Sequence, residues 1–279
     1  MNQYTEIDGI RCYAPEFAKS NKDYPSGHFK KLFALESNHF WFRSRNRIIS
    51  KLVKKYLGNK TKFLEIGCGT AFVLNGIAKK LPQLELSGAE IHLDGLKQAR
   101  ERLPNADFIQ LDARNLPFKN SFDAIGAFDV IEHITEDEDV LKSVHTALTK
   151  NGHLFLTVPQ HKWLWSTTDE AAFHKRRYTR KELTDKVTQA GFTVLFVTSF
   201  VSTLLPLMLA SRLRKQKKTH SQIEGMEYSY DELKLPYWLN FILEQFMRID
   251  ELLINLKISL PFGGSLALVA KKRIISGDA

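Results

Sequence analysis

The stretch Lys62–Thr70, read K-F-L-E-I-G-C-G-T, decides the fold of this chain, because a short apolar run ends there in two glycines spaced by one residue. Glycine lets the backbone turn sharply and lets a ligand approach the main chain where a Cβ would collide. Residues 71–80 are compatible with a helix that stops at Leu81 and Pro82. We therefore predict a strand–loop–helix unit, the place where a parallel α/β sheet binds a nucleotide-like ligand.

The residues of this loop narrow the choice of ligand. The dinucleotide fingerprint needs a third glycine three positions after Gly69, and that position holds Phe72. Glu65, two positions before Gly67, is poorly placed against a phosphate because like charges repel. A cationic or zwitterionic ligand fits better, which disfavours a NAD-dependent dehydrogenase. A tight turn without a ligand is the alternative interpretation.

Acidic residues also end the next two predicted strands. The strand at 84–91 ends in Glu90 and Ile91, and the strand at 107–111 is followed by Asp112 and Ala113. In nucleotide-binding α/β folds an acidic residue at the position of Glu90 accepts hydrogen bonds from ribose hydroxyls; the alternative is a solvated carboxylate. Acidic residues at three successive strand ends are a stronger signal than any one of them.

The segment E-I-G-C-G-T resembles the cofactor loop of class I S-adenosylmethionine (SAM) methyltransferases, with Ala71 where a third glycine commonly stands. The resemblance covers roughly residues 36–200. It implies that Asp112 takes the adenine amino group and that the backbone N–H of Ala113 meets a ring nitrogen. It also implies a doubly wound, Rossmann-like α/β sheet of seven strands, the last one antiparallel. The cofactor-binding residues that we predict are Glu65, Gly67, Gly69, Glu90, Ile91, Asp112, Ala113 and Phe128.

The fourth predicted strand, 124–128, leads into the segment Glu132-His133-Ile134. DNA and protein amide methyltransferases usually show an Asn/Asp-Pro-Pro-Tyr/Phe pattern here, and this chain lacks both prolines. The segment resembles instead small-molecule O- and N-methyltransferases, including the ubiquinone-pathway O-methyltransferases. We predict His133 as the general base, because imidazole titrates near neutral pH and can take a hydroxyl proton. The alternative is a histidine that caps the loop beneath the cofactor.

The loop at 163–180, which follows the fifth strand, has an unusual density of reactive side chains. Because strand C-termini share one edge of a sheet, we expect this loop to face the same cleft as His133. His174, Arg177 and Tyr178 are predicted to orient the acceptor. A surface loop with its basic residues in solvent is the alternative.

A second resemblance raises the question of a metal. Small-RNA 2′-O-methyltransferases bind a divalent ion through a Glu-x-x-Glu-His segment and a later histidine. Asp129, Glu132, His133 and His174 reproduce that spacing, with aspartate in place of the first glutamate. Such a set could bind an ion that acidifies a substrate hydroxyl. We predict no metal, because E-H-I is common in relatives that use none.

Four segments make up the predicted domain organisation. We expect an N-terminal cap at 1–43 that is irregular over residues 1–35, a SAM-binding core at 44–200, a helical lid at 201–260 that covers the substrate, and the last strand within 261–279. The residues Phe40–Phe42 and Arg43 are predicted to roof the active site, with a basic group near the cofactor carboxylate.

Charge and apolar segments suggest partners. The net charge of +9 permits an anionic partner. An apolar run at 201–210 precedes Arg212, Arg214, Lys215, Lys217 and Lys218, a pattern typical of peripheral membrane contact; a packed insertion is the alternative. The helix predicted at 237–256 is apolar enough to cover the cleft, a second subunit or a lipid.

The cellular setting follows from the cysteines and the N-terminus. Cys12 and Cys68 are far apart in the sequence, which favours a reducing compartment, and the first residues do not resemble a signal peptide. We expect a cytoplasmic enzyme, peripheral at the inner membrane surface, that methylates a small-molecule or lipid-linked acceptor at oxygen. A non-catalytic SAM-binding protein and an RNA methyltransferase remain as alternatives, although nothing in the sequence resembles an appended RNA-binding motif.

Overall fold

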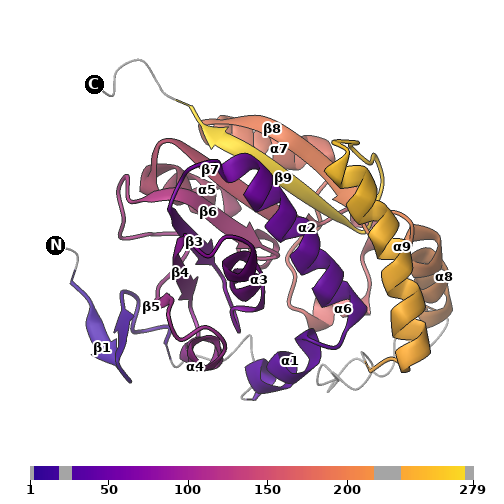
Figure 1. The fold of residues 1–279 in the computed structure, drawn as a ribbon, viewed down its shortest axis with the longest axis horizontal. Helices are drawn as coiled ribbons and strands as arrows, with labels where there is room; N and C mark the ends of the chain where they lie inside the picture. The colour runs from indigo at the N-terminus through magenta and orange to yellow at the C-terminus, as the bar shows by residue number, and fades with distance from the viewer. Residues whose placement is uncertain (1–2, 19–26, 217–233, 274–279) are drawn as a thin grey trace.

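The molecule is built on one mixed β-sheet that has helices on both faces (Figure 1). The computed structural model describes residues 3–18, 27–216 and 234–273, and for 212–216 only the backbone. Lys217 and Lys218 of the predicted basic cluster lie outside these residues. The strands are β1 (Thr5–Ile7), β2 (Ile10–Cys12), β3 (Lys62–Ile66), β4 (Glu85–Glu90), β5 (Asp107–Gln110), β6 (Phe122–Phe128), β7 (Leu148–Pro159), β8 (Phe192–Phe200) and β9 (Ser265–Lys272).

The strand order is β1-β2-β5-β4-β3-β6-β7-β9-β8. Strands β5, β4, β3, β6 and β7 pair in parallel, and β9 lies antiparallel between β7 and β8. The predicted doubly wound sheet with a reversed last strand is therefore confirmed. Because the first five of these strands run the same way, their carboxyl ends meet at one edge, and the site is built there.

The prediction that residues 1–35 are irregular was wrong in two respects. Residues 28–36 form a helix, and β1 and β2 form a hairpin whose second strand pairs in parallel with β5, so the described sheet has nine strands rather than seven. Each of the two strands has three residues, too few for a hydrophobic alternation to be recognised in the sequence. Pairing with the sheet edge supplies the hydrogen bonds that such short strands lack alone.

Helices cover both faces of the sheet. The longer ones are α1 (His28–Glu36), α2 (Phe40–Leu57), α3 (Phe72–Lys80), α4 (Leu93–Arg102), α5 (Asp137–Ala147), α7 (Arg180–Gln189), α8 (Leu205–Gln216) and α9 (Tyr237–Asn255). Two 3₁₀ turns, η1 (Ile131–His133) and η2 (Lys162–Leu164), and the short α6 (Thr167–Ala171) lie in the loops. None of the helices in the described residues is both long and apolar enough to cross a membrane.

Alternation along β3 divides the core into two layers. Phe63 packs in one apolar cluster with residues of α2, α3 and α4, while Leu64 and Ile66 pack in the other with residues of α5 and α7. Successive side chains of a strand point to opposite faces, so Glu65 shares the face of Phe63. That acidic residue therefore lies on the side of the sheet that α2 and α3 cover.

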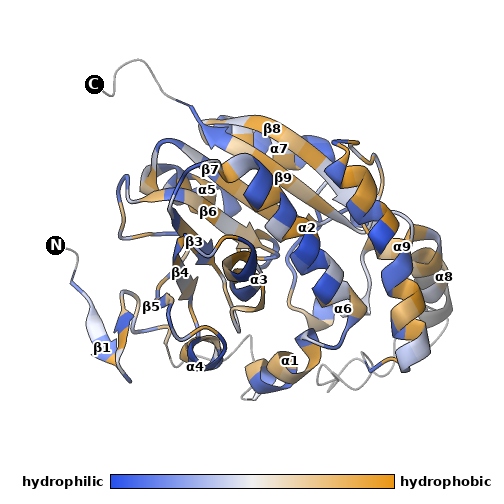
Figure 2. Cartoon of the chain, in the orientation of Figure 1, coloured by the Kyte–Doolittle hydropathy of each residue, from blue (hydrophilic) through white to orange (hydrophobic). Residues whose placement is uncertain are grey.

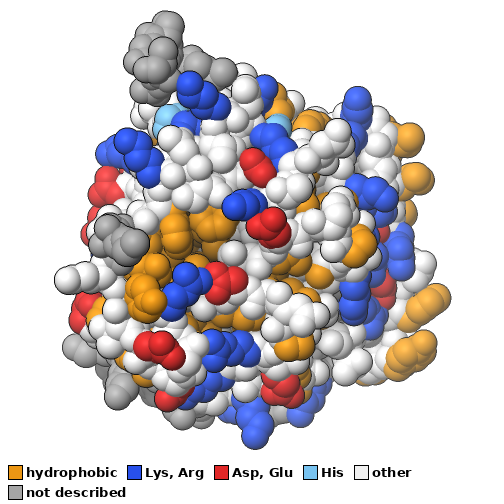
Figure 3. Space-filling model, turned by 60° about the vertical axis from the view of Figure 1, so that its left-hand side comes forward, with side chains coloured by type: hydrophobic (Ala, Val, Ile, Leu, Met, Phe, Trp, Pro, Cys, Tyr) orange, Lys and Arg blue, Asp and Glu red, His pale blue; other side chains and the backbone are white. Residues whose placement is uncertain are grey.

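Helix α9 packs against α2, and charged pairs join the two helices. The outer surface has a mixed character: in Figure 3, Lys and Arg side chains are spread among acidic and hydrophobic ones over the face shown. On this face the net charge of +9 is not gathered into one basic patch.

Candidate active site

The glycine loop after β3 makes a turn that side chains would obstruct. Gly67 and Gly69 have φ values of 63° and 51°, in the left-handed region that favours glycine. A Cβ added to Gly67 would lie 2.5 Å from Cγ2 of Val130, so a larger residue would force the loop away from the end of β6. Ala71, at φ 56°, then leads into α3.

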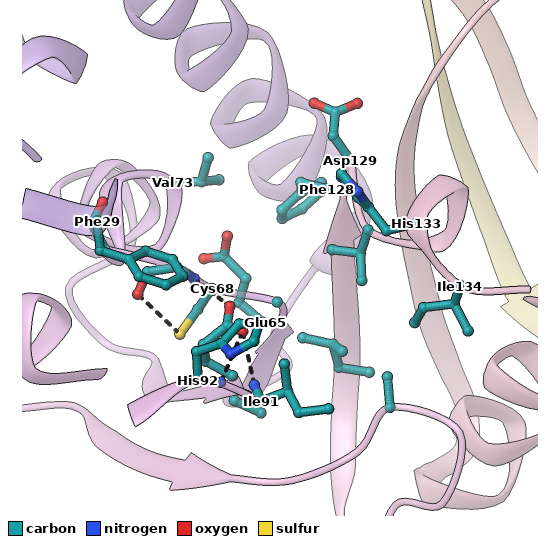
Figure 4. A pocket seen from close by; sticks show the side chains of 18 of the residues that line it. Phe29, Glu65, Cys68, Val73, Ile91, His92, Phe128, Asp129, His133 and Ile134 are labelled. Carbon is teal, nitrogen blue, oxygen red and sulfur yellow. Dashed lines mark hydrogen bonds between the residues drawn. The ribbon is translucent and has the colours of Figure 1, made fainter. Parts of the chain in front are cut away.

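A cavity of about 540 Å³ opens beside this loop at the carboxyl ends of β3, β4, β5 and β6 (Figure 4). Ligand pockets of small molecules have volumes of about 300–1,000 Å³. The residues predicted from the sequence meet in this cavity. Those that line it are Glu65, Gly67, Gly69, Glu90, Ile91, Asp112, Ala113, Phe128 and His133.

Glu65 presents a buried carboxylate to the cavity. The residue is 2% exposed, and its Oε2 atom has no hydrogen-bond partner among the described residues. Burial raises the pKa of Glu65 to about 8, with the nearby carboxylates Glu36 and Glu90 acting in the same direction. A buried carboxylate without a partner is costly, and a cation entering the cavity would relieve that cost. The site therefore fits a positively charged ligand group.

Glu90 ties the glycine loop to the end of β4. Its Oε2 accepts from the backbone N–H of Gly69 at 3.1 Å, and its Oε1 accepts from the N–H of Ile91 at 2.8 Å. The carboxylate still lines the cavity and keeps lone pairs for further donors. Figure 4 shows Ile91 and His92 beside Glu65 and Cys68 at this strand edge.

Asp112 has a partner that the sequence analysis did not anticipate. Arg114 lies across its carboxylate, with Nε and Nη2 donating to Oδ2 at 2.9 and 2.7 Å. Both residues line the cavity. A ligand amino group at Asp112 would have to share this carboxylate with Arg114, and the role of Asp112 stays a prediction.

The roof of the cavity comes from α1 and α2, and its basic group is Arg45 rather than Arg43. Trp41, Phe42 and Arg45 line the cavity, and the Arg45 guanidinium lies 5.3 Å from the ring centroid of Trp41. Arg43 forms its ion pair with Glu244 of α9 instead. The aromatic part of the predicted roof is thus placed correctly for Trp41 and Phe42, while the basic residue is two positions further along the helix.

A buried network of hydrogen bonds, which the sequence analysis did not predict, joins helix α1 to the glycine loop. The hydroxyl of Thr70 donates to Glu36 at 2.5 Å, and Arg102 of α4 donates to Thr70 Oγ1 at 2.6 Å. Arg102 also lies over the ring of Phe33 at 4.1 Å. These partners are separated by more than thirty positions in the chain, so no local spacing reveals them.

His133 reaches the cavity from the end of η1, directly after β6. Burial, together with the neighbouring His174, lowers the pKa of His133 to about 4. The imidazole is therefore neutral at physiological pH and has a lone pair to accept a proton. Figure 4 shows His133 and Asp129 on the opposite side of the cavity from Phe29 and Cys68.

His174, Arg177 and Tyr178, which were predicted to orient the acceptor, do not line the cavity. Tyr178 is fully buried, and its hydroxyl donates to Asp137 at 2.7 Å. Arg177 donates to Asp169 at 2.7 Å and to the carbonyl of Gln160 at 3.0 Å. The acceptor role predicted for Tyr178 is corrected accordingly: its hydroxyl serves the packing of α5 onto the loop.

His174 stands behind His133. The two rings lie edge to face with centroids 4.8 Å apart, and Nδ1 of His174 lies 3.0 Å from Asp169. Although burial acts against it, the hydrogen bonds from His174 and Arg177 lower the pKa of Asp169 to about 2. His174 does not itself line the cavity, whereas His133, against which it packs, does.

One group of side chains could hold a metal ion. Glu132, His133 and His174 each offer a ligand atom, and these atoms lie within 4.8 Å of one another. Neither carboxylate oxygen of the fully buried Glu132 has a hydrogen-bond partner among the described residues. Burial, followed by the effect of Asp129, raises the pKa of Glu132 well above its ordinary value. Asp169 would fix the tautomer of His174 as carboxylates do behind metal-binding histidines.

The described part of the predicted lid, 201–216 and 234–260, lies away from this cavity, and the lid itself stays a prediction. None of the described residues in the range 201–260 lines it, and α9 packs against α2 instead. The cover is provided by α1 and the first turns of α2.

Comparison with known proteins agrees with this geometry. Residues 64–154 match the family model of a methyltransferase domain. Demethylmenaquinone methyltransferase of Thermotoga maritima is 31% identical over 113 residues, which cover 40% of this chain and 48% of that protein. Ubiquinone/menaquinone biosynthesis C-methyltransferase of Campylobacter jejuni RM1221 is 26% identical over 53% of this chain and 60% of its own length. The chain thus spans about half the length of these curated relatives.

Solved structures share the fold at low identity. Phosphoethanolamine N-methyltransferase 2 of Haemonchus contortus, solved in complex with S-adenosyl-L-methionine, is 16% identical with a TM-score of 0.60, over 92% of this chain and 60% of that one. A putative methyltransferase of Haloferax volcanii, in complex with an activator, gives a TM-score of 0.56 at 14% identity, over 88% of this chain and 96% of that chain.

Proposed function

We propose that this chain, which carries a class I SAM-dependent methyltransferase domain, transfers a methyl group from SAM to a small-molecule or lipid-linked acceptor at oxygen. The observation that carries the proposal is the convergence of Glu65, the glycine loop and His133 on one cavity. SAM supplies an activated methyl group on a sulfonium. The protein then has to hold the nucleophile in line and remove its proton.

The cofactor assignment rests on the charge of the cavity. Glu65 offers a cationic ligand a buried carboxylate oxygen, Oε2, that has no hydrogen-bond partner among the described residues, while Glu90 and Asp112 border the cavity at the next two strand ends. Arg45 at the roof offers a positive charge to a ligand carboxylate. A zwitterionic amino-acid group attached to a nucleoside satisfies all of these features.

His133 would accept the proton of the acceptor hydroxyl. Its neutral form predominates at physiological pH because burial lowers its pKa to about 4. A base of this strength removes a proton only as the oxygen becomes acidic during methyl transfer, so the proton shift accompanies the transfer. The ring of His174 packs against the ring of His133 and keeps the His133 imidazole in place.

The relatives suggest where to search for the acceptor. Their names include a demethylmenaquinone methyltransferase and a trans-aconitate 2-methyltransferase, the latter from Afipia carboxidovorans and 28% identical over 35% of this chain and 38% of that protein. The aromatic side chains of Phe29, Trp41 and Phe42 in the cavity favour an acceptor with a flat apolar part. One of the relatives is named a C-methyltransferase, so transfer to carbon is the competing outcome.

A second candidate function is metal-assisted methylation of an RNA 2′-hydroxyl. The unpartnered carboxylate of Glu132 beside His133 and His174 favours it. Nucleic-acid binding usually needs a basic patch, and on the face that Figure 3 shows the basic side chains are spread among acidic and hydrophobic ones, so this face does not favour it.

The test begins with the cofactor. We would titrate the purified protein calorimetrically with SAM and, separately, with NAD, and then follow methyl transfer from labelled SAM to demethylmenaquinol, trans-aconitate and hydroxylated aromatic compounds. Micromolar binding of SAM without a response to NAD supports the cofactor, and the methylated atom in the product decides between oxygen and carbon. A protein that does not bind SAM would overturn the proposal.

A further inference from the structure

Helix α9 buries its carboxylates and exposes a long row of apolar side chains. Its buried residues are the polar Asn240, Glu244, Asp250 and Glu251 and the apolar Leu243, Met247 and Ile254. Its exposed residues include Trp238, Phe241 and Leu252, and Leu256 follows directly after the helix; the exposed fractions of these four lie between 53% and 63%. Figure 2 shows hydrophilic and hydrophobic stretches alternating along this helix. The outer face of a surface helix in a globular protein is normally polar.

The inward polar face is explained by its partners. Arg47 of α2 donates to Glu244 at 2.6 Å and to Glu251 at 2.7 Å. Asp250 accepts from the backbone N–H groups of Ser202 and Thr203 at 2.7 and 3.2 Å, just before α8. These bonds and the buried Leu243, Met247 and Ile254 fix the inner face of α9, and the remaining apolar side chains are left on the outer face.

The apolar surface is longer than the scattered exposed hydrophobic residues of ordinary proteins. A helix of the length of α9 extends over about 28 Å, and exposed apolar residues continue beyond it at Ile258 and Phe262. Leu207 of the neighbouring α8 is 55% exposed. Contiguous apolar surfaces of this kind mark contacts with proteins or membranes.

The exposed charged side chains in this part of the chain are all positive. Between residues 234 and 262, all within the described part of the chain, every carboxylate is buried, whereas Lys234, Arg248 and Lys257 are exposed. The guanidinium of Arg248 lies 3.8 Å from the carboxylate of Glu244 and 3.7 Å from that of Glu251, but the Arg248 side chain remains half exposed.

We propose that the outer face of α9, together with Leu207 of α8, docks onto the surface of a lipid bilayer that carries anionic headgroups. Apolar side chains enter the interface, Tyr237 and Trp238 suit the headgroup level, and the cations meet the negative lipid charges. A second copy of the chain fits less well, because a two-fold contact through this face would bring the cations of both copies together.

Docking would also orient the cavity. Helix α9 packs on α2, whose first turns carry the roof residues Trp41 and Arg45. A membrane under α9 would therefore lie next to the helix that covers the candidate active site. The inference does not rest on the proposed methyl transfer, since its test measures binding alone.

The test compares vesicles of phosphatidylcholine with vesicles that also contain phosphatidylglycerol, using flotation of the full chain. We expect flotation with the anionic vesicles that weakens at high salt. The double variant F241Q/L252Q should lower the affinity at least about tenfold, because it removes two apolar groups from the interface. The matched control is L195Q on β8, a residue 42% exposed outside this face, which should float like the parent chain.

A second variant separates charge from apolar contact. R248Q/K257Q should weaken binding to the anionic vesicles and reduce its salt dependence, while circular dichroism confirms that both double variants are folded. Equal flotation of F241Q/L252Q and the parent chain, or no flotation at all, would overturn the proposal. A dimer in light scattering that F241Q/L252Q dissociates, without vesicle binding, would assign the face to a second copy instead.

Discussion

Arg45 of α2 is joined to Asp129 at the end of β6: its Nε lies 2.5 Å from Asp129 Oδ2. Nη2 of the same guanidinium donates to the carbonyl of Phe128 at 2.7 Å. Asp129 has a φ of 56°, a strained value for a residue with a side chain. The ion pair thus fixes the turn that leads to His133 and connects the roof of the cavity to its floor.

Replacing Arg45 should therefore damage cofactor binding. We expect R45M to lower SAM affinity at least about tenfold, because a charged hydrogen bond within a mostly buried site contributes about 1.5–3 kcal/mol. Calorimetric titration measures the effect. R43M, which removes the neighbouring arginine that pairs with Glu244, is the control and should bind SAM within a few-fold of the parent chain. Unchanged affinity in R45M would refute the assigned role.

Glu65 should determine how SAM binding depends on pH. Since burial raises its pKa to about 8, a cationic ligand that needs the ionised carboxylate should bind more tightly as the pH rises from 7 to 9. We expect E65Q to weaken SAM binding about tenfold or more and to flatten this part of the profile. E85Q, on the exposed start of the neighbouring β4, should retain both the affinity and the pH dependence. A profile that is identical in E65Q and the parent chain would contradict this site.

Loss of the His133 side chain should lower the activity, whereas loss of the Tyr178 hydroxyl should lower the stability. H133Q is expected to lower kcat about 10²–10⁴-fold with little change in SAM affinity, as is typical for loss of a general base. Y178F removes a buried hydroxyl that donates to Asp137 and should instead lower the free energy of unfolding by about 1–2 kcal/mol. Kinetics and urea unfolding of both variants separate the two roles. An H133Q protein with full activity would favour a non-catalytic role for the histidine.

Metal dependence separates the two candidate functions. If the reaction needs no metal, the protein should keep its methyl-transfer activity after treatment with a chelator. Titration with Mn²⁺ or Zn²⁺ should then show no saturable binding that depends on Glu132, so the parent chain and E132Q should give the same result. Restoration of activity by one of these ions, lost in E132Q, would establish the cluster of Glu132, His133 and His174 as a metal site.

Buried histidines should make the protein less stable in acid. Burial lowers the pKa values of His28, His39, His133 and His153 to about 4, whereas the unfolded chain titrates near 6.5. Below pH 6.5 the unfolded state therefore binds protons that the folded state rejects, and stability falls as the pH decreases towards 4. H133Q should remove about 1–2 kcal/mol of the difference between pH 7 and pH 5. Urea unfolding at both values measures it, and equal differences in the two proteins would exclude this origin.

Sequence reasoning located the part of the site that local spacing controls. A strand followed by Gly67 and Gly69, and acidic residues at the ends of the next strands, could be placed at one edge because the parallel strands of such a sheet share their direction. His133 could be added because it directly follows another strand of the same set. All of these residues line the cavity.

The remainder depended on contacts between distant segments. Two positions along a helix point in different directions, so Arg45 lines the cavity while Arg43 meets Glu244 of α9, and the sequence does not show which side of α2 faces the sheet. Tyr178 was misassigned because an aromatic side chain in a polar loop looks the same in a sequence whether it faces a cavity or the core.

By itself the sequence determined the positions of the central strands, the glycine turn and the acidic strand ends, because these depend on apolar runs and on residues that are neighbours in the chain. Only the tertiary structure decided that Oε2 of Glu65 is buried without a hydrogen-bond partner among the described residues, that α1 and α2 border the cavity, and that a row of apolar side chains of α9 lies on the surface. The physical reason is that burial and charge pairing are properties of the packed chain: the carboxylates of α9 are buried because they meet Arg47 of α2, which lies about 200 positions away in the chain.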